Sequence, residues 1–236
     1  MKIHMTGDTH GVFERIEKWC REHACTKDDL MVIMGDAGIN FLGYYHDREK
    51  KAFLQSLPIT FLCIHGNHEM RPESLDYYEL TDWQNGKVWV EKDYPNILFA
   101  KDGEVYDLNG LKVLVVGGAY SVDKYYRIIY RMPWFEDEQP SEKIKKEVED
   151  ALEKHHWKVD VVLSHTTPLK YEPREVFLPG LDQSTVDKST ENWLDFIEDR
   201  LDYQHWYCGH YHTVKEIDKM HFLYENYVEL PYSDNV

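Results

Sequence analysis

Residues 59–69 read Ile-Thr-Phe-Leu-Cys-Ile-His-Gly-Asn-His-Glu, an almost uninterrupted apolar run that ends in a cluster of polar side chains. An apolar run without alternation is typical of a strand that is buried on both faces of a sheet. In open α/β sheets, ligands bind just beyond the carboxyl ends of the strands. We therefore expect the polar residues 65–69 to lie at the ligand-binding edge of such a sheet.

Four further segments have the same design, in which an apolar run stops at polar or glycine residues. They are residues 3–6 before Gly7-Asp8, 30–34 before Gly35-Asp36, 159–163 before Ser164-His165 and 206–208 before Gly209-His210. Strand ends that all carry polar donors indicate one shared site.

Three apolar stripes with helical spacing lie over residues 12–20, 144–152 and 193–201. Strands that alternate with helices indicate βαβ units and a largely parallel sheet toward the N-terminal end. In the middle of the chain, three Asx-Gly pairs separate short β-rich runs and predict hairpins in a mixed or antiparallel portion of sheet. These pairs are Asn85-Gly86, Asp102-Gly103 and Asn109-Gly110. The pattern predicts an α/β fold with two sheets, in a single domain over residues 1–236.

The formal net charge of -16 disfavours a broad nucleic-acid surface or an anionic membrane as partner. It does not exclude a phosphorylated substrate, because the local charge of a site decides binding there. The sequence has no apolar stretch long enough to cross a bilayer. Residues 1–5 lead straight into Gly7-Asp8 without room for a signal peptide. Since the four cysteines form no Cys-x-x-Cys pair, we expect reduced thiols and a cytoplasmic location.

Seven potential metal ligands stand at the five strand ends. They are Asp8, His10, Asp36, Asn67, His165, His210 and His212, and one further histidine, His68, stands beside them. Each short motif alone is weak evidence, because Asp after Gly is ordinary turn chemistry and a single histidine is commonly a hydrogen-bonded core residue. Their common position at strand ends favours two transition-metal ions and metal-assisted hydrolysis.

The ordered set of motifs resembles that of the calcineurin-like metallophosphoesterases, over nearly the whole chain from Asp8 to His212. The resemblance implies a four-layer α/β/β/α sandwich with two mixed β-sheets and a two-metal centre at its edge. It also implies that a metal-bridging hydroxide attacks a phosphate ester in line, with His68 as the general acid that protonates the leaving oxygen.

By the same resemblance, Asp8 and His10 bind one metal together with His212. Asn67, His165 and His210 bind the second metal, and Asp36 bridges the two. A bridging carboxylate holds two such ions about 3.5–4 Å apart. Mixed imidazole and carboxylate donors suit manganese, which we expect first, or iron, zinc or cobalt, better than calcium or magnesium.

The chain departs from the serine/threonine protein phosphatase branch of this family. Where that branch has an Asp and an Arg after the second motif, this sequence has Ile39 and Asn40, so a protein-phosphatase assignment is in doubt. His68 then needs another orienting partner, for which Glu69 is a candidate.

A guanidinium fork that binds phosphate is expected elsewhere in the chain. The candidates are Arg71, Arg127 and Arg131, each of which is equally well explained as part of a surface salt bridge.

The sequence leaves four hypotheses for the function. The leading reading is a phosphomonoesterase, and its alternative is a phosphodiesterase for cyclic nucleotides or short nucleic acids. A non-catalytic scaffold is disfavoured because every ligand and His68 are retained, and hydrolysis at carbon is disfavoured by the order of the motifs. The expected partner is a phosphate-ester substrate, while protein partners stay open.

Overall fold

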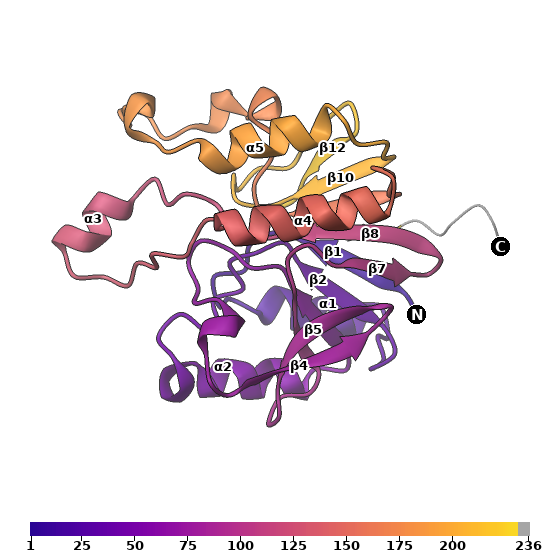
Figure 1. The fold of residues 1–236 in the computed structure, drawn as a ribbon. Helices are drawn as coiled ribbons and strands as arrows, with labels where there is room; N and C mark the ends of the chain where they lie inside the picture. The colour runs from indigo at the N-terminus through magenta and orange to yellow at the C-terminus, as the bar shows by residue number, and fades with distance from the viewer. Residues whose placement is uncertain (231–236) are drawn as a thin grey trace.

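The computed structural model describes residues 1–230, so residues 231–236 of the expected domain lie outside the described residues. Two mixed β-sheets of seven and six strands stack face to face, and helices cover the outer face of each sheet (Figure 1). The expected α/β fold with two mixed sheets is confirmed.

The first sheet has the strand order β13-β1-β2-β3-β6-β5-β4. Strands β1, β2, β3 and β6 run parallel, while β13, β5 and β4 pair antiparallel to their neighbours. The strands are β1 (Ile3–Thr6), β2 (Leu30–Ile33), β3 (Thr60–Cys63), β4 (Tyr78–Trp83), β5 (Gly86–Glu91), β6 (Ile97–Ala100) and β13 (Val228–Glu229).

The second sheet has the order β11-β12-β10-β9-β8-β7. Its four inner strands are parallel, and β11 and β7 pair antiparallel at its edges. The strands are β7 (Val105–Leu108), β8 (Leu111–Val116), β9 (Val161–Ser164), β10 (His205–Cys208), β11 (Lys215–Ile217) and β12 (Met220–Phe222).

The helices that cover the first sheet are α1 (Glu14–Glu22) and α2 (Tyr44–Ser56), and those on the second sheet are α4 (Glu142–Lys154) and α5 (Ser189–Glu198) (Figure 1). Helix α3 (Lys124–Ile129) lies on a segment that protrudes from the body of the molecule. Single 3-10 turns form at Pro72–Ser74, Leu169–Tyr171, Arg174–Val176 and Gln183–Thr185. The apolar stripes predicted α1, α4 and α5, but not the short α3 or α2, whose apolar residues do not gather on one face.

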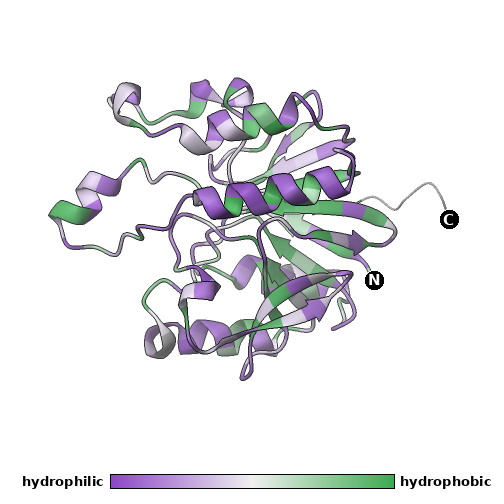
Figure 2. Cartoon of the chain, in the orientation of Figure 1, coloured by the Kyte–Doolittle hydropathy of each residue, from purple (hydrophilic) through white to green (hydrophobic). Residues whose placement is uncertain are grey.

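Three apolar clusters fill the three interfaces between the four layers. Alternate residues of each central strand point to opposite faces of the sheet. In β2, Leu30 and Val32 face the second sheet, whereas Met31 and Ile33 pack under α1 and α2. Val162 and Trp206 likewise lie in the cluster beneath α4 and α5. Figure 2 shows the resulting apolar strands and the polar outer faces of the helices.

Two of the three Asx-Gly pairs form the expected hairpins, and one does not. Asn85 has a φ of 65° in the β4–β5 turn, and Asn109 has a φ of 55° in the β7–β8 turn. The hairpin expected at Asp102-Gly103 is wrong, because this pair connects β6 in the first sheet with β7 in the second. The buried Asp102 carboxylate accepts a hydrogen bond from the Gly117 N–H at 2.5 Å, so it fixes a crossing between sheets.

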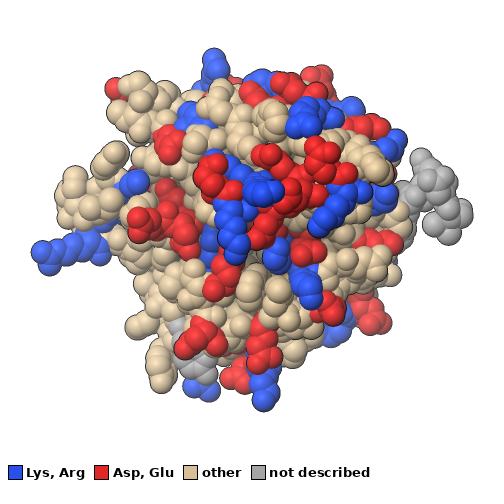
Figure 3. Space-filling model, in the orientation of Figure 1, with Lys and Arg blue, Asp and Glu red and all other residues tan. Residues whose placement is uncertain are grey.

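Among residues 1–230, no helix is both long enough and apolar enough to span a bilayer. On the face drawn in Figure 3, acidic and basic side chains intermingle over α4, and no extended basic patch is seen there.

Candidate metal centre

The loops that follow β1, β2 and β3 in the first sheet and β9 and β10 in the second meet at one edge of the sandwich. Two glycines allow the close approach of these loops. A Cβ at Gly66 would lie 2.0 Å from Asp36 Oδ1, and one at Gly209 would lie 2.4 Å from Asp8 Oδ1. The recurrent Gly in the motifs therefore makes room for a carboxylate of a neighbouring loop.

The first group of potential ligands brings together residues from near the start and near the end of the described residues. Asp8, His10 and His212 each offer a ligand atom, and these atoms lie within 4.8 Å of one another. His10 Nε2 is 3.0 Å from His212 Nε2, and His212 Nε2 is 3.2 Å from Asp8 Oδ2. The other oxygen of Asp8, Oδ1, accepts a hydrogen bond from the backbone N–H of His210 at 2.9 Å. This bond fixes the carboxylate in place.

The second group lies deeper in the site. His165 Nε2 is 2.9 Å from Asn67 Oδ1, and the ring of His210 lies edge-on to that of His165 with centroids 5.0 Å apart. Asp36 Oδ1 is 3.8 Å from His165 Nε2, while Asp36 Oδ2 is 4.0 Å from His10 Nε2. The two oxygens of Asp36 thus face different groups. Asp8 is also near both, since Asp8, Asp36 and His165 form a second set of neighbouring ligand atoms.

The second group fits a cation on the chemistry of its donors. His165 Nδ1 lies 2.8 Å from the Met34 carbonyl, which only accepts hydrogen bonds, so this nitrogen carries the proton. Asn67 Nδ2 donates to Ser121 Oγ at 2.9 Å, which turns Asn67 Oδ1 toward His165 Nε2 at 2.9 Å. An imidazole nitrogen and an amide oxygen that lie side by side are donors that suit a divalent transition metal.

The backbone at the site is strained. His10, Asp36, His210 and His212 have φ values between 47° and 64°, a left-handed conformation that costs non-glycine residues of order 1–3 kcal/mol each. Such strain persists only where the surrounding structure fixes it, and it is concentrated at functional sites.

Burial and hydrogen bonding shift the pKa values at the site in opposite directions. Burial raises the pKa of Asp8, but the hydrogen bond from His212 and the nearby His165 and His10 outweigh burial and hold the pKa below its ordinary value. The same hydrogen bond raises the pKa of His212. Burial lowers the pKa of His210 well below its ordinary value, which leaves a neutral imidazole able to bind a metal.

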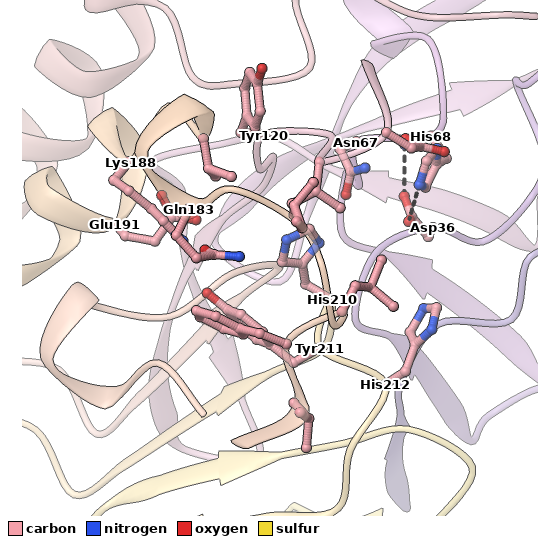
Figure 4. Close-up of a pocket in the computed structure, with 17 residues that line it drawn as sticks. Asp36, Asn67, His68, Tyr120, Gln183, Lys188, Glu191, His210, Tyr211 and His212 are labelled. Atoms are coloured by element: carbon pink, nitrogen blue, oxygen red, sulfur yellow. Dashed lines mark hydrogen bonds and ion pairs between the residues drawn. The ribbon is translucent and has the colours of Figure 1, made fainter. Parts of the chain in front are cut away.

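His68 lies beside Asp36 at the edge of this cluster. The backbone N–H of His68 donates to Asp36 Oδ1 at 2.8 Å, and the ring Nε2 of His68 is 3.8 Å from Asp36 Oδ2 (Figure 4). Burial lowers the pKa of His68, and the charge of Asp36 opposes that shift. Glu69, the candidate orienting partner, instead accepts a hydrogen bond from the Gly66 N–H at 2.8 Å and braces the loop. Asn40 accepts one from the Tyr78 hydroxyl at 3.1 Å.

The three candidate arginines lie in different surroundings. Arg71 is 3% exposed, and its Nη1 donates to Asp102 Oδ2 at 2.5 Å. Arg127 Nε donates to Asp123 Oδ2 at 2.7 Å, and Arg131 is exposed beyond the end of α3. Among the described residues that line the cavity beside the site, none of the three arginines occurs, but Asp123 does.

A cavity of about 380 Å³ opens beside the potential metal ligands. Figure 4 shows Asp36, Asn67 and His68 at one end of the cavity and Lys188, Glu191 and Gln183 at the other.

Two residues that support the cluster were not anticipated. Arg15 Nη2 on α1 donates to the carbonyls of Gly7 and Asp8, both at 3.2 Å. Ser121 orients Asn67 as described above. Neither has a motif of its own, although an Arg on an otherwise core-facing helix stripe, one turn after the Asp-x-His pair, is a weak signal for Arg15.

Three comparisons with known proteins bear on the identity of the chain. Residues 1–214 match the family model "Calcineurin-like phosphoesterase". No curated protein matched the sequence. Similar solved structures include a protein of unknown function from Aquifex aeolicus and a phosphopantetheinyl hydrolase from Mycobacterium tuberculosis.

The Aquifex protein is 14% identical, with 86% of this chain and 87% of that chain covered and a TM-score of 0.36. The mycobacterial protein is 12% identical, with 94% and 88% covered and a TM-score of 0.48. The assignment rests on the family model and not on these distant likenesses. By its sequence from residue 1 to residue 214, this chain belongs to the calcineurin-like phosphoesterase family.

Proposed function

We propose that this chain is a metal-dependent phosphoesterase with two divalent transition-metal ions, manganese first among the candidates, that hydrolyses phosphomonoesters. One observation carries the proposal. Seven side chains from five strand ends gather in one cluster, in which two groups of three have ligand atoms within 4.8 Å of one another and His165 Nε2 lies 2.9 Å from Asn67 Oδ1. We further propose that residues 1–236 form one domain and act in the cytoplasm.

The residues have separate roles in this proposal. Asp8, His10 and His212 hold one ion, Asn67, His165 and His210 hold the other, and Asp36 contacts both. When bound, the two ions lower the pKa of water and withdraw charge from the phosphoryl oxygens. His68 lies on the cavity side of Asp36 and protonates the leaving oxygen as a general acid.

The charge of the site favours the monoester. Two divalent cations beside the carboxylates of Asp8 and Asp36 leave the site net positive. The dianion of a phosphomonoester gains more from that field than the monoanion of a phosphodiester. The exposed side of the ligand group, where the His10 side chain is 38% exposed, leaves the substrate a route of entry.

The test compares hydrolysis of p-nitrophenyl phosphate and bis-p-nitrophenyl phosphate by manganese-loaded protein, with Asp36→Asn as the blank. We expect activity on the monoester and little on the diester. A preference for the diester would refute the monoester assignment and select the phosphodiesterase alternative. Full metal occupancy without turnover of either substrate would instead support a scaffold.

A further inference from the structure

The cavity beside the metal ligands is much larger than a phosphate group needs. Its volume of about 380 Å³ falls in the range of sites for organic ligands. Beyond the ligand end, the lining is mainly apolar and aromatic. It comprises Tyr120, Val122, Phe177, Leu181, Val186 and Tyr211, among others.

Two segments form the walls of this cavity. One follows β8 and contributes Tyr120 and Val122, and the other lies between β9 and α5 and contributes seven lining residues between positions 176 and 188. Since β8 and β9 are adjacent parallel strands, both segments leave the same edge of the second sheet and rise beside the metal ligands. The cavity is therefore continuous with the reaction site and is positioned to hold the group esterified to the phosphate.

Two of the charged groups in the described lining have an ionic partner. Lys188 Nζ forms an ion pair with Glu172, and it lies 4.9 Å from the centre of the Phe177 ring. Asp123 pairs with Arg127. Burial raises the pKa of Glu191 to about 7. This carboxyl is therefore either neutral or negatively charged, and in neither form does it attract an anion. A second anionic group of a substrate would meet no unmatched cation among these lining residues.

Resting on the phosphoesterase activity proposed above, we propose that the substrate is a phosphate ester of an uncharged, largely apolar alcohol or phenol, whose apolar part occupies this cavity. The enzyme thereby discriminates against esters that carry a second anionic group, such as nucleoside polyphosphates or acidic phosphopeptides.

A substrate series with matched leaving groups tests this inference. Phenyl phosphate, 4-butylphenyl phosphate and 4-(3-carboxypropyl)phenyl phosphate release phenols of similar acidity, so differences in kcat/KM report the cavity. We expect the butyl compound to exceed phenyl phosphate by about tenfold or more, since its four additional carbons leave water for the apolar lining. We expect the carboxylate to fall below the butyl compound by at least as much. Equal values for all three esters would overturn the inference.

A charge introduced into the wall sharpens the test. Leu181→Lys should lower the rate on the butyl ester and raise the rate on the carboxylate, so that the preference inverts. Leu80→Lys is the matched control, because Leu80 is 39% exposed on β4 and is not among the cavity-lining residues. An unchanged preference in Leu181→Lys, with the melting temperature of the wild type, would also overturn the inference.

Binding of non-hydrolysed analogues separates this inference from the proposed function. Calorimetry should show 4-butylbenzylphosphonate binding about tenfold more tightly than benzylphosphonate. If phenyl phosphate is hydrolysed and Asp36→Asn is inactive, but the butyl group adds neither rate nor affinity, only the cavity inference fails. If no ester is hydrolysed by manganese-loaded protein, the phosphoesterase proposal fails and the substrate inference falls with it.

Discussion

The metal-ligand cluster and the cavity walls lie side by side but are built differently. In the cluster, hydrogen bonds between loops fix the buried carboxylates. Asp8 accepts one from the backbone N–H of His210, and Asp36 accepts one from the backbone N–H of His68. In the walls, exposed or half-buried apolar residues such as Leu178 and Leu181 stand on segments with little regular structure. If both proposals hold, the chemistry rests mainly on the strand ends, and the selectivity rests mainly on the segments that follow β8 and β9.

Loss of a shared ligand should give the largest effect. Asp36→Asn removes the carboxylate charge that faces both ligand groups, and we expect loss of bound manganese and a fall in kcat/KM of about a thousandfold or more. Metal analysis and phenyl phosphate turnover measure these two effects. Asp123→Asn is the control, because this carboxylate lines the same cavity but belongs to neither group of neighbouring ligand atoms. Full metal content in Asp36→Asn would rule out its bridging role.

Two arginine–aspartate pairs, one buried and one partly exposed, should differ in how much they stabilise the protein. Arg71 and Asp102 are both nearly fully buried, so Arg71→Met leaves an uncompensated charge and should destabilise the protein by about 3 kcal/mol or more. Arg127 pairs with an Asp123 side chain that is 39% exposed, and Arg127→Met should lower the unfolding free energy by about 1 kcal/mol or less. Urea denaturation measures both. Similar losses in the two variants would show that the buried pair stabilises the protein no more than the partly exposed pair does.

His68 should act on the leaving group and not on metal binding. His68→Ala is expected to retain the metal and to slow hydrolysis of phenyl phosphate by about a hundredfold, the lower end of the range for general acid catalysis. Hydrolysis of p-nitrophenyl phosphate, whose leaving group needs little protonation, should fall far less. Equal losses on the two esters would count against the acid role and favour a purely positioning one.

The cavity wall should also contribute a pH dependence of stability. Burial raises the pKa of Glu191 to about 7, and Lys188, Glu172, Thr166 and Tyr211 surround it. Between its ordinary pKa of 4.5 and about 7, the folded protein holds a proton that the unfolded chain releases. The unfolding free energy should therefore fall as the pH rises through this window, by at most about 1.4 kcal/mol per pH unit.

Glu191→Gln should remove this part of the pH dependence. Denaturation at pH 5 and pH 8 in the wild type and the variant measures it, because the other titrating groups cancel in the difference. If the wild type and the variant lose the same stability between pH 5 and pH 8, Glu191 is ionised in the folded protein and the prediction is wrong.

The sequence predicted the cluster better than the walls, for physical reasons. A ligand such as Asp8 or His165 directly follows a buried apolar strand, and that local pattern places it at the sheet edge without knowledge of the rest of the fold. Phe177 and Leu181 lie in a segment without periodicity, so their approach to Tyr211 depends on how whole layers pack. The error at Asp102-Gly103 has the same origin, since an Asx-Gly turn does not specify whether the next strand returns to its own sheet.

The separation of the ligands along the chain has a consequence for synthesis. Asp8 and His212 are close in space but 204 positions apart in the sequence. A ribosome that adds about 5–20 residues per second exposes Asp8 and His10 for ten seconds or longer before His212 is made. The nascent chain thus holds an incomplete group of metal donors during that time. Because the last candidate ligands arrive with the second sheet, we expect hydrolytic activity to appear only after His212 has been made.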